Sequence, residues 1–360
     1  VLSQKSLDPN LKTPYTQSYN LNLQYEFKPG WVAELGYVGS HTIHTVTGRD
    51  FNEPLLATAT DPVNCDGPSG CITTNTAANA KQRVPVLGIA PGGFADAGNW
   101  GYSNYNSLQA VLRKRFSNGL QLQASYTYGR SFTNVVGVNL QGGVAGSINS
   151  NDPNSLTQSY GPSDFERPQR LIISYLYTLP APHRDTFLAT KLLSGWSVSG
   201  ITTAQSGQPI TFTDPRGGAV YGSFSSSRAQ LCPGESYSDV TTSGGISSRL
   251  NGYFNSAAFC APPIIGAIGG VGGATGYGDT ARAVLLGPGQ FNWDIALVKD
   301  TKVGGIREDA SLQFRTEFFN AFNHADFANP GSAVGTGSFG VISSTTVGPR
   351  ILQFALKYSF

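Results

Sequence analysis

Apolar and polar residues alternate with a period of two in many segments of this chain, which limits the folds that it can adopt. In residues 19–27 the odd positions are Tyr, Leu, Leu, Tyr and Phe, whereas the even positions are Asn, Asn, Gln and Glu. Such alternation places the apolar side chains on one face of an extended strand and the polar side chains on the other. Lys28-Pro-Gly30 then predicts a tight turn, and residues 31–37 repeat the pattern, so the two segments form a hairpin.

Further segments carry the same pattern, which gives about nine predicted strands in all. The others are residues 108–116, 120–128, 171–179, 195–205, 291–297, 312–318 and 352–360. Segment 195–205 has the weakest pattern because most of its residues are small. Ser117-Asn-Gly119 predicts a second tight turn between two of these strands.

The connections between these strands alternate in length along the chain. The turns at residues 28–30 and 117–119 are minimal, whereas residues 41–103, 133–167 and 207–288 form long loops rich in Gly, Ser, Asn and Pro. This alternation is typical of outer-membrane barrels, which have short periplasmic turns and long extracellular loops. We therefore predict an all-β fold, an antiparallel transmembrane β-barrel located in the cell outer membrane of a Gram-negative bacterium.

Composition agrees with a membrane barrel and excludes several other classes. No run of about 18 apolar residues exists, so a membrane-spanning helix is not expected. The net charge is +2 without a Lys/Arg cluster, which argues against a nucleic-acid partner. Residues 186–193 predict a short helix on the periplasmic side. Lys114 falls on an apolar face near a turn, where we expect its stem to follow lipid and its ammonium to reach water.

The chain contains no methionine, and its predicted strand count is odd. Because bacterial single-chain barrels have an even number of strands, we expect a fragment of a larger barrel. The four cysteines form two pairs, Cys65 with Cys71 and Cys232 with Cys260, without zinc-site spacing. Disulfides that staple the loops in an oxidising compartment are favoured over free thiols, and pairing between the loops remains open.

Four stretches carry a resemblance to a known family. They are Asp164–Arg170 (DFERPQR), Gly195–Ile201 (GWSVSGI) with Ser206–Pro209 (SGQP), Phe314–His324 (FRTEFFNAFNH), and Lys357–Phe360 (KYSF). In this order they resemble the C-terminal barrel of Oar-like TonB-dependent receptors, which carry an N-terminal carboxypeptidase-regulatory-like domain. The resemblance implies a 22-stranded barrel with an internal plug, energised through TonB. Residues 1–360 would supply its C-terminal part, with the plug and the regulatory-like domain absent.

The end of the chain resembles the signal that the barrel-assembly machinery reads. Its pattern of a polar residue, a small residue and closing aromatic residues falls on Gln353, Ala355, Tyr358 and Phe360. The usual glycine is replaced by Ala355, which is a mild departure. The alternative interpretation is that any final strand with one apolar face ends in this way.

Two sets of side chains are candidates for contact with the surroundings of the barrel. The polar residues expected to face the lumen are Asn22, Gln24, Glu26, Gln121, Gln123, Arg315 and Glu317. The aromatic residues expected at the bilayer interfaces are Trp31, Tyr37, Phe116, Tyr128, Trp196 and Phe322. The Arg315–Glu317 pair either contacts a ligand or the plug, or forms a structural ladder with neighbouring strands, and the ladder is favoured.

No motif predicts covalent chemistry or a cofactor. His41 and His44 lack a neighbouring carboxylate or cysteine, so a metal site is not expected. Gly276–Ala281 matches G-x-G-x-x-A, but it lies in a glycine-rich loop without a strand before it. We therefore expect no enzyme.

Four functional hypotheses remain for such a barrel. The leading one is a receptor that imports a ligand too large for porins, with outer-membrane lipid, the assembly machinery and TonB as partners. TonB would act through the missing N-terminal part. A structural or adhesive surface protein is the alternative, followed by a passive porin and an enzyme in the loops. The resemblance suggests a carbohydrate or oligopeptide ligand, but no residue selects either.

Overall fold

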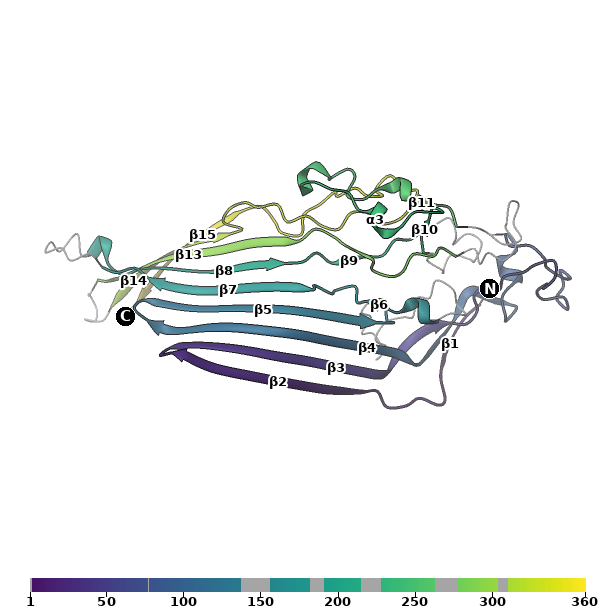
Figure 1. Ribbon diagram of the computed structural model, residues 1–360, viewed down its shortest axis with the longest axis horizontal. Helices are drawn as coiled ribbons and strands as arrows, with labels where there is room; N and C mark the ends of the chain where they lie inside the picture. The colour runs from purple at the N-terminus through teal and green to yellow at the C-terminus, as the bar shows by residue number, and fades with distance from the viewer. Residues whose placement is uncertain are drawn as a thin grey trace.

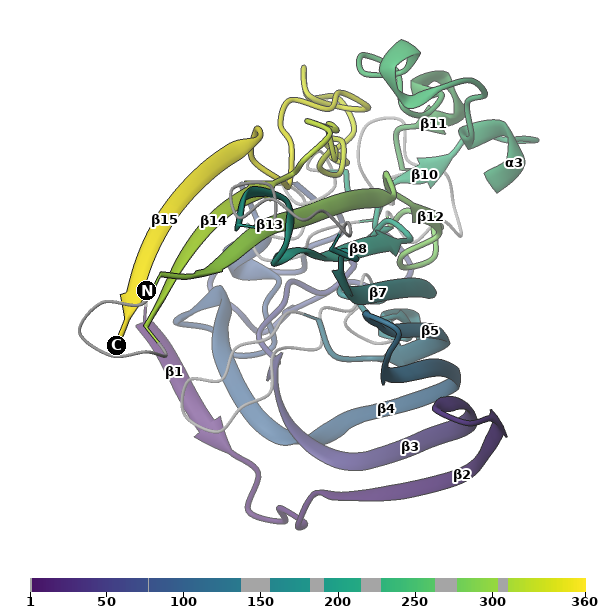
Figure 2. The same cartoon turned by 90° about the vertical axis from the view of Figure 1, so that its left-hand side faces the viewer.

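A curved antiparallel sheet dominates the structure, which is a computed structural model (Figures 1 and 2). The described residues are 2–76, 78–136, 156–181, 191–214, 228–262, 277–303 and 310–360. Nine strands follow one another across the sheet. They are β2 (Tyr15–Lys28), β3 (Trp31–Asp50), β4 (Ile89–Ser117), β5 (Leu120–Thr133), β7 (Gln169–Thr178), β8 (Trp196–Gln205), β13 (Gln290–Lys302), β14 (Ser311–Phe319) and β15 (Ile351–Ser359).

The register of these strands keeps like faces together. Leu35 lies opposite Leu23 on one side and Ala110 on the other, and Ala110 lies opposite Tyr126. Because cross-strand partners share a face, the apolar positions of successive strands join into one continuous band. Each of the nine strands predicted from the alternation is present, and the prediction of an all-β, antiparallel fold is confirmed.

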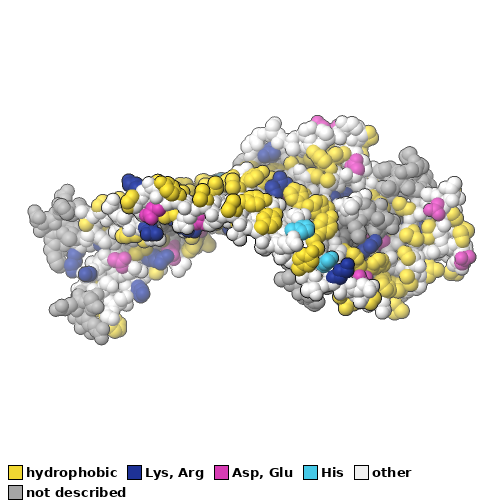
Figure 3. All heavy atoms as spheres, turned by 60° about the horizontal axis from the view of Figure 1, so that its bottom comes forward, with side chains coloured by type: hydrophobic (Ala, Val, Ile, Leu, Met, Phe, Trp, Pro, Cys, Tyr) yellow, Lys and Arg dark blue, Asp and Glu magenta, His cyan; other side chains and the backbone are white. Residues whose placement is uncertain are grey.

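The apolar band faces outward and is exposed. Leu21 is 76% exposed and Phe354 is 63% exposed, so these side chains do not meet in a dry interior. Figure 3 shows hydrophobic side chains along the forward face, which is the convex side of the arc in Figure 2. An apolar surface of this extent is expected to contact lipid, because exposure of so many apolar side chains to water is unfavourable.

Strands β3 and β4 extend far beyond the predicted segments, and the prediction of a loop over residues 41–103 is wrong at both ends. The loop is confined to residues 51–88. Strand β4 has 29 residues, whereas about 9–11 suffice to cross a bilayer. The outer part of this hairpin therefore extends past the length that a bilayer requires, and its sequence lacks the alternation of the predicted segments. A bulge at Thr42–Thr45, with His44 at φ 60°, also interrupts the period.

The short turns lie at one end of the sheet and the long loops at the other (Figure 1). At the turn after β4, Asn118 and Gly119 have positive φ, and a Cβ on Gly119 would lie 2.6 Å from the Thr178 carbonyl oxygen. The expectation that Lys114 reaches water is wrong. Lys114 is buried, and its Nζ donates to the carbonyl oxygens of Ser117 and Leu120, each at 2.7 Å, because the turn brings both acceptors within reach of its side chain.

The smaller elements lie mainly among the loops. The short strands are β1 (Leu2–Leu7), which pairs with β4 in parallel, β6 (Gly161–Pro162) beside β5, β9 (Pro209–Ile210) with β12 (Leu285–Leu286), and β10 (Gln230–Leu231) with β11 (Phe259–Cys260). The helices are η1 (Ala80–Gln82), η3 (Leu156–Ser159), α3 (Tyr237–Val240), η4 (Ile246–Ser248) and η5 (Ser256–Ala258). Of the helix predicted at 186–193, residues 186–190 lie outside the described residues, and 191–193 are helical. No helix within the described ranges is long and apolar enough to cross a membrane.

Two long connections pack together into a unit that we call the loop cap, comprising residues 206–214, 228–262, 277–289 and 320–350. It has its own hydrophobic core, in which Phe212 is completely buried. The ring of Phe212 lies 4.8 Å from Phe254 and 4.7 Å from Phe259, measured between centroids. Val334 and Ile342 bring the connection between β14 and β15 into the same core. The cap therefore packs apolar side chains inward, in the manner of a water-soluble domain.

Candidate functional site on the polar wall and the loop-side rim

The face of the sheet opposite the apolar band carries a polar ladder across β2, β3 and β4. Glu34 in β3 forms an ion pair with Arg113 at 3.0 Å and accepts a hydrogen bond from Asn22 Nδ2 at 2.6 Å. Gln24 lies opposite Glu34 in the register. Glu26 accepts a hydrogen bond from the Gly30 backbone N–H at 2.7 Å, which stabilises the turn. Of the residues predicted to face the lumen, Asn22 and Glu26 form hydrogen bonds within this sheet, which we call the wall.

A groove of about 380 Å³ lies on the other half of the sheet, between β7, β8, β13 and β14. Arg315 and Glu317 line it and form an ion pair at 2.6 Å, and Asp294 lines it as well. Gln121 and Gln123 lie on the same polar face in β5, opposite Leu176 and Ser174, and both are exposed. The arrangement can bind polar groups and charges, but contact of these side chains with a ligand stays a prediction.

Three exposed apolar side chains interrupt the polar face, and sequence reasoning did not single them out. One of them, Ile351, is 58% exposed on the edge strand β15, opposite Phe319. Ile201 in β8 lies opposite Ser174 and Asp294, and it is 51% exposed. Phe319 at the end of β14 shares the face of Glu317 and is 40% exposed. Strands β8 and β14 have neighbours on each side, so a free sheet edge does not cause the exposure of Ile201 and Phe319. The alternation could have identified them, because all three apolar residues occupy positions that the period of two assigns to the polar face.

The Asp164–Arg170 motif stabilises the end of the sheet that carries the long loops. Glu166 is buried and accepts hydrogen bonds from Arg130 Nε at 2.8 Å and from the Ser131 backbone N–H at 2.9 Å. Asp164 forms an ion pair at 2.9 Å with Arg282, which comes from the loop cap. The two carboxylates therefore hold one connection against both β5 and the cap.

The same motif is tied to Ser206–Pro209. Arg167 donates to the Ser206 carbonyl oxygen at 2.7 Å, and the Ser206 backbone N–H donates to the Gln169 carbonyl oxygen at 2.9 Å. A Cβ on Gly207 would lie 1.9 Å from the Gly287 carbonyl oxygen, so only glycine allows this close approach. These two motifs thus form one structural junction at the rim.

The Phe314–His324 motif ends β14 and orders the chain that follows. Asn320 has φ 51° and is buried, and its Nδ2 donates to the carbonyl oxygens of His324 and Gly348. Its backbone N–H donates to Asp294 Oδ1 at 2.9 Å. Asp326, also buried, accepts from the Phe291 backbone N–H at 2.7 Å. The motif therefore positions the start of the cap rather than a reactive group.

Two buried arginines join the cap to the connection between β5 and β7. Arg228 donates to the carbonyl oxygens of Gln158 and Thr280, and Arg282 donates to those of Thr133 and Ser159. Burial, and secondarily the charge of Arg282, lowers the pKa of Arg228 to about 10. The sequence does not predict the role of either arginine, because their partners are mostly backbone carbonyl groups of distant segments.

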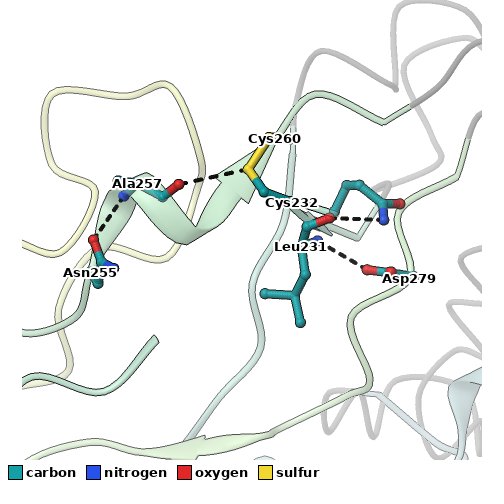
Figure 4. The surroundings of a disulfide bond; sticks show 7 residues. Leu231, Cys232, Asn255, Ala257, Cys260 and Asp279 are labelled. Atoms are coloured by element: carbon teal, nitrogen blue, oxygen red, sulfur yellow. Dashed lines mark hydrogen bonds between the residues drawn. A yellow bond between two sulfur atoms is a disulfide. The ribbon is translucent and has the colours of Figure 1, made fainter. Parts of the chain in front are cut away.

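Disulfides join Cys65 to Cys71 and Cys232 to Cys260, so the bonds lie within the pairs and not between the loops. Figure 4 shows the second bond, which links Cys232, the residue after β10, to Cys260 in β11. Beside it, the Leu231 backbone N–H donates to Asp279 Oδ1 at 3.0 Å, and the Ala257 N–H donates to Asn255 Oδ1 at 3.1 Å. This bond therefore lies in the surface of the cap, away from the apolar band.

The predicted interface aromatics lie near both ends of the wall strands. Trp31 lies beside Lys114, with Nζ 5.9 Å from the ring, and Trp196 Nε1 donates to the Leu192 carbonyl oxygen. Tyr37 hydroxyl donates to Asn106, and Phe322 packs against Trp293 with centroids 4.8 Å apart. Phe116 and Tyr128 are exposed. Their contact with an interface stays a prediction.

The residues of the predicted assembly signal lie at the end of the last strand. Gln353 and Ala355 share the polar face, opposite Glu317 and Arg315, whereas Tyr358 is on the apolar face and stacks on Phe360. Recognition by the assembly machinery stays a prediction.

The histidines do not form a metal site in the described part of the chain. His41 is hydrogen-bonded to Asn104, and the ring of His44 lies 5.8 Å from that of Tyr15. No group of three or more His, Cys, Asp or Glu side chains suited to a metal ion occurs in these ranges.

Comparison with known proteins gives one family and several distant structures. The family model described as "Outer membrane beta barrel domain" matches residues 2–353. The outer membrane transporter YddB from Escherichia coli is 12% identical with a TM-score of 0.49, over 99% of this chain and 34% of that chain. BauA, the ferric preacinetobactin receptor from Acinetobacter baumannii, is 12% identical with a TM-score of 0.42, over 96% and 29%. The pyoverdine receptor FpvA from Pseudomonas aeruginosa is 11% identical with a TM-score of 0.42, over 97% and 30%.

The chain spans about a third of the length of these solved structures. No curated protein matches it.

Proposed function

The chain belongs to the outer-membrane β-barrel family, and we propose that it is the C-terminal part of a TonB-dependent receptor. In this proposal the receptor imports a ligand too large for porins, and it performs no covalent catalysis. The family motifs quoted from the sequence support the Oar-like subtype. The free edges of β2 and β15 within the described sheet are consistent with further strands that complete a larger barrel.

The observation that carries the proposal is the mixed character of the polar wall. A passive porin encloses water, and its lumen is polar. Here the side chains of Ile201 and Phe319 are 51% and 40% exposed on that face, beside the Arg315–Glu317 pair. Exposed apolar groups of this kind favour a folded partner that covers them, such as a plug, over a water-filled channel.

Ion conductance of the full-length protein in planar bilayers tests the proposal. A plugged receptor is expected to show no steady conductance, and deletion of the plug should produce large channels. Replacing Ile201 and Phe319 by Asn should weaken plug contact and produce intermittent conductance, whereas Leu21→Asn, outside the lumen, serves as the matched control. Steady conductance of the intact protein would instead establish a passive porin.

The well-packed loop cap favours one alternative, an adhesive surface protein. Its buried core and disulfide give the exposed end a fixed shape, which suits recognition of a large surface. A deletion strain separates the two functions. Loss of TonB-dependent uptake with normal attachment supports the receptor, and loss of attachment with normal uptake supports the adhesin.

A further inference from the structure

A cluster of aromatic and amide side chains lies on the outward face of the wall, directly beyond the apolar band. It consists of Tyr102, Asn104, Asn106, Arg130, Phe132 and Tyr160, and we call it the rim patch. In the register, Asn104 lies opposite Phe132 and Asn106 lies opposite Arg130. Asn106 is two residues from Leu108 and therefore shares the face of the band. The rim patch cannot contact a solute inside the lumen, because it lies on the opposite side of the sheet.

The rim patch is continuous with the membrane-facing surface. The hydroxyl groups of Tyr19 and Tyr37 both donate to Asn106 Oδ1 at 2.8 Å. Hydrogen bonds therefore connect the aromatic rings at the loop-side end of the apolar band to the rim patch. In Figure 3 histidine side chains lie at the loop-side end of the hydrophobic band, and His41 is bonded to Asn104. Since the long loops are extracellular, this level corresponds to the headgroups of the outer leaflet.

The geometry of the rings is suited to a flat, hydroxylated partner. Tyr160 stacks on Tyr102 with centroids 5.3 Å apart and on Phe132 at 5.9 Å. Asn104 Nδ2 donates to the Tyr160 hydroxyl at 3.3 Å, so the rings and amides form one connected surface. Ring faces pack against C–H groups, while amide and phenol groups donate to and accept from hydroxyl groups.

The guanidinium of Arg130, which forms an ion pair with Glu166 at 2.8 Å, completes this surface. The Arg130 guanidinium lies 5.1 Å above the Phe132 ring, and its side chain is 44% exposed. Glu166 accepts a hydrogen bond from Arg130 Nε, and a guanidinium has five N–H groups, so donors remain that suit a phosphate.

We infer that the rim patch binds the phosphorylated sugar headgroup of a glycolipid in the outer leaflet. The sugar ring packs on the Tyr102–Tyr160–Phe132 surface, Asn104 and Asn106 contact its hydroxyl groups, and Arg130 contacts the phosphate. The acyl chains of the same molecule then lie along the apolar band below. This contact is independent of the ligand that the receptor imports.

Retention of glycolipid by the full-length protein tests this inference. The protein is extracted, freed of lipid, and returned to phosphatidylcholine vesicles with or without lipopolysaccharide, and the glycolipid kept after washing in detergent is counted by native mass spectrometry. The double variant Tyr102→Leu/Tyr160→Leu should retain about tenfold less, which corresponds to about 1.4 kcal/mol. Tyr25→Leu removes an exposed ring at the opposite end of the band and should retain as much as the native protein.

Further variants and ligands test whether the retained molecule is held through the stacked rings and is a glycolipid. Tyr160→Phe keeps the ring and should stay within about twofold of the native retention, because the stacked surface remains. Heat-modifiable migration of every variant checks that the barrel is folded. Three results would each overturn the glycolipid assignment. They are native-level retention of lipopolysaccharide by the double variant, equal retention of phosphatidylglycerol when it replaces lipopolysaccharide in the vesicles, and displacement of bound lipopolysaccharide by a soluble oligosaccharide.

Discussion

The barrel wall and the loop cap use the same kinds of side chain in opposite ways. On the wall, Leu21, Leu23 and Phe354 point outward and are 76%, 70% and 63% exposed. In the cap, Phe212, Phe254 and Phe259 are buried against one another. The wall depends on lipid to cover its apolar surface, whereas the cap supplies its own core.

Two solvents therefore act on one chain. In the wall the backbone ladder satisfies the peptide groups, and hydrocarbon replaces a packed interior. In the cap, water surrounds the chain, so stability comes from burial, a disulfide and buried arginines. The two regions should therefore respond to different perturbations.

The largest effect is expected in the cap core. Phe212→Ala removes a completely buried ring and should destabilise the cap by about 4 kcal/mol, as do other truncations of buried aromatics. Limited proteolysis should then cleave the loops while heat-modifiable migration of the barrel is unchanged. Phe354→Ala on the wall is the matched control and should leave the loops resistant. Equal cleavage in both variants would contradict the separation of the two regions.

A charge on the wall should distinguish its two faces. Ala124→Arg introduces a charge at the central position of the lipid-facing segment of β5 and is expected to cost about 3 kcal/mol near the middle of the bilayer. Ser125→Arg, one residue away on the polar face, should cost little. Urea unfolding of the two variants in phospholipid vesicles measures the difference. A similar loss in both would mean that the face of Ala124 is not in lipid.

Removal of the disulfide in the cap should have a smaller effect, confined to the loops. Cys232→Ser with Cys260→Ser is expected to destabilise the cap by about 2–3 kcal/mol, since the bond closes a loop of moderate length. Proteolysis near residues 232–260 reports the change. The Cys65/Cys71 double serine variant, whose bond lies in another loop, should leave that region intact.

The smallest effect concerns a single helical turn at the surface of the cap. The Ser236 hydroxyl and, secondarily, its backbone N–H donate to Asp239, which lowers the pKa of that carboxyl. A lowered folded-state pKa contributes stability above the unfolded-state value, and this contribution is lost as the pH falls through the folded-state value. Amide protection factors over residues 236–241 should therefore fall on acidification. In Asp239→Asn they should be low throughout and independent of this titration.

The strands of the wall and their two faces follow from the residue pattern alone. Alternation in segments such as 19–27 and 120–128 specifies both the strand and the face that meets lipid, because a membrane strand has one apolar and one polar side. The same rule separated Gln121 from Leu122, and it located the short turns. Cysteine spacing indicated the disulfides while leaving their pairing open.

The other features depend on contacts between distant segments or on the length of the strands. The outer halves of β3 and β4 extend past the length that a bilayer requires, so they need no single apolar face and carry no alternation for a pattern to detect. The cap core joins Phe212, Phe254 and Val334 from segments far apart in the chain, and no local period predicts such contacts. Arg228 and Arg282 bind backbone carbonyl groups, which every residue possesses. Their partners became identifiable only once the fold had brought these segments together.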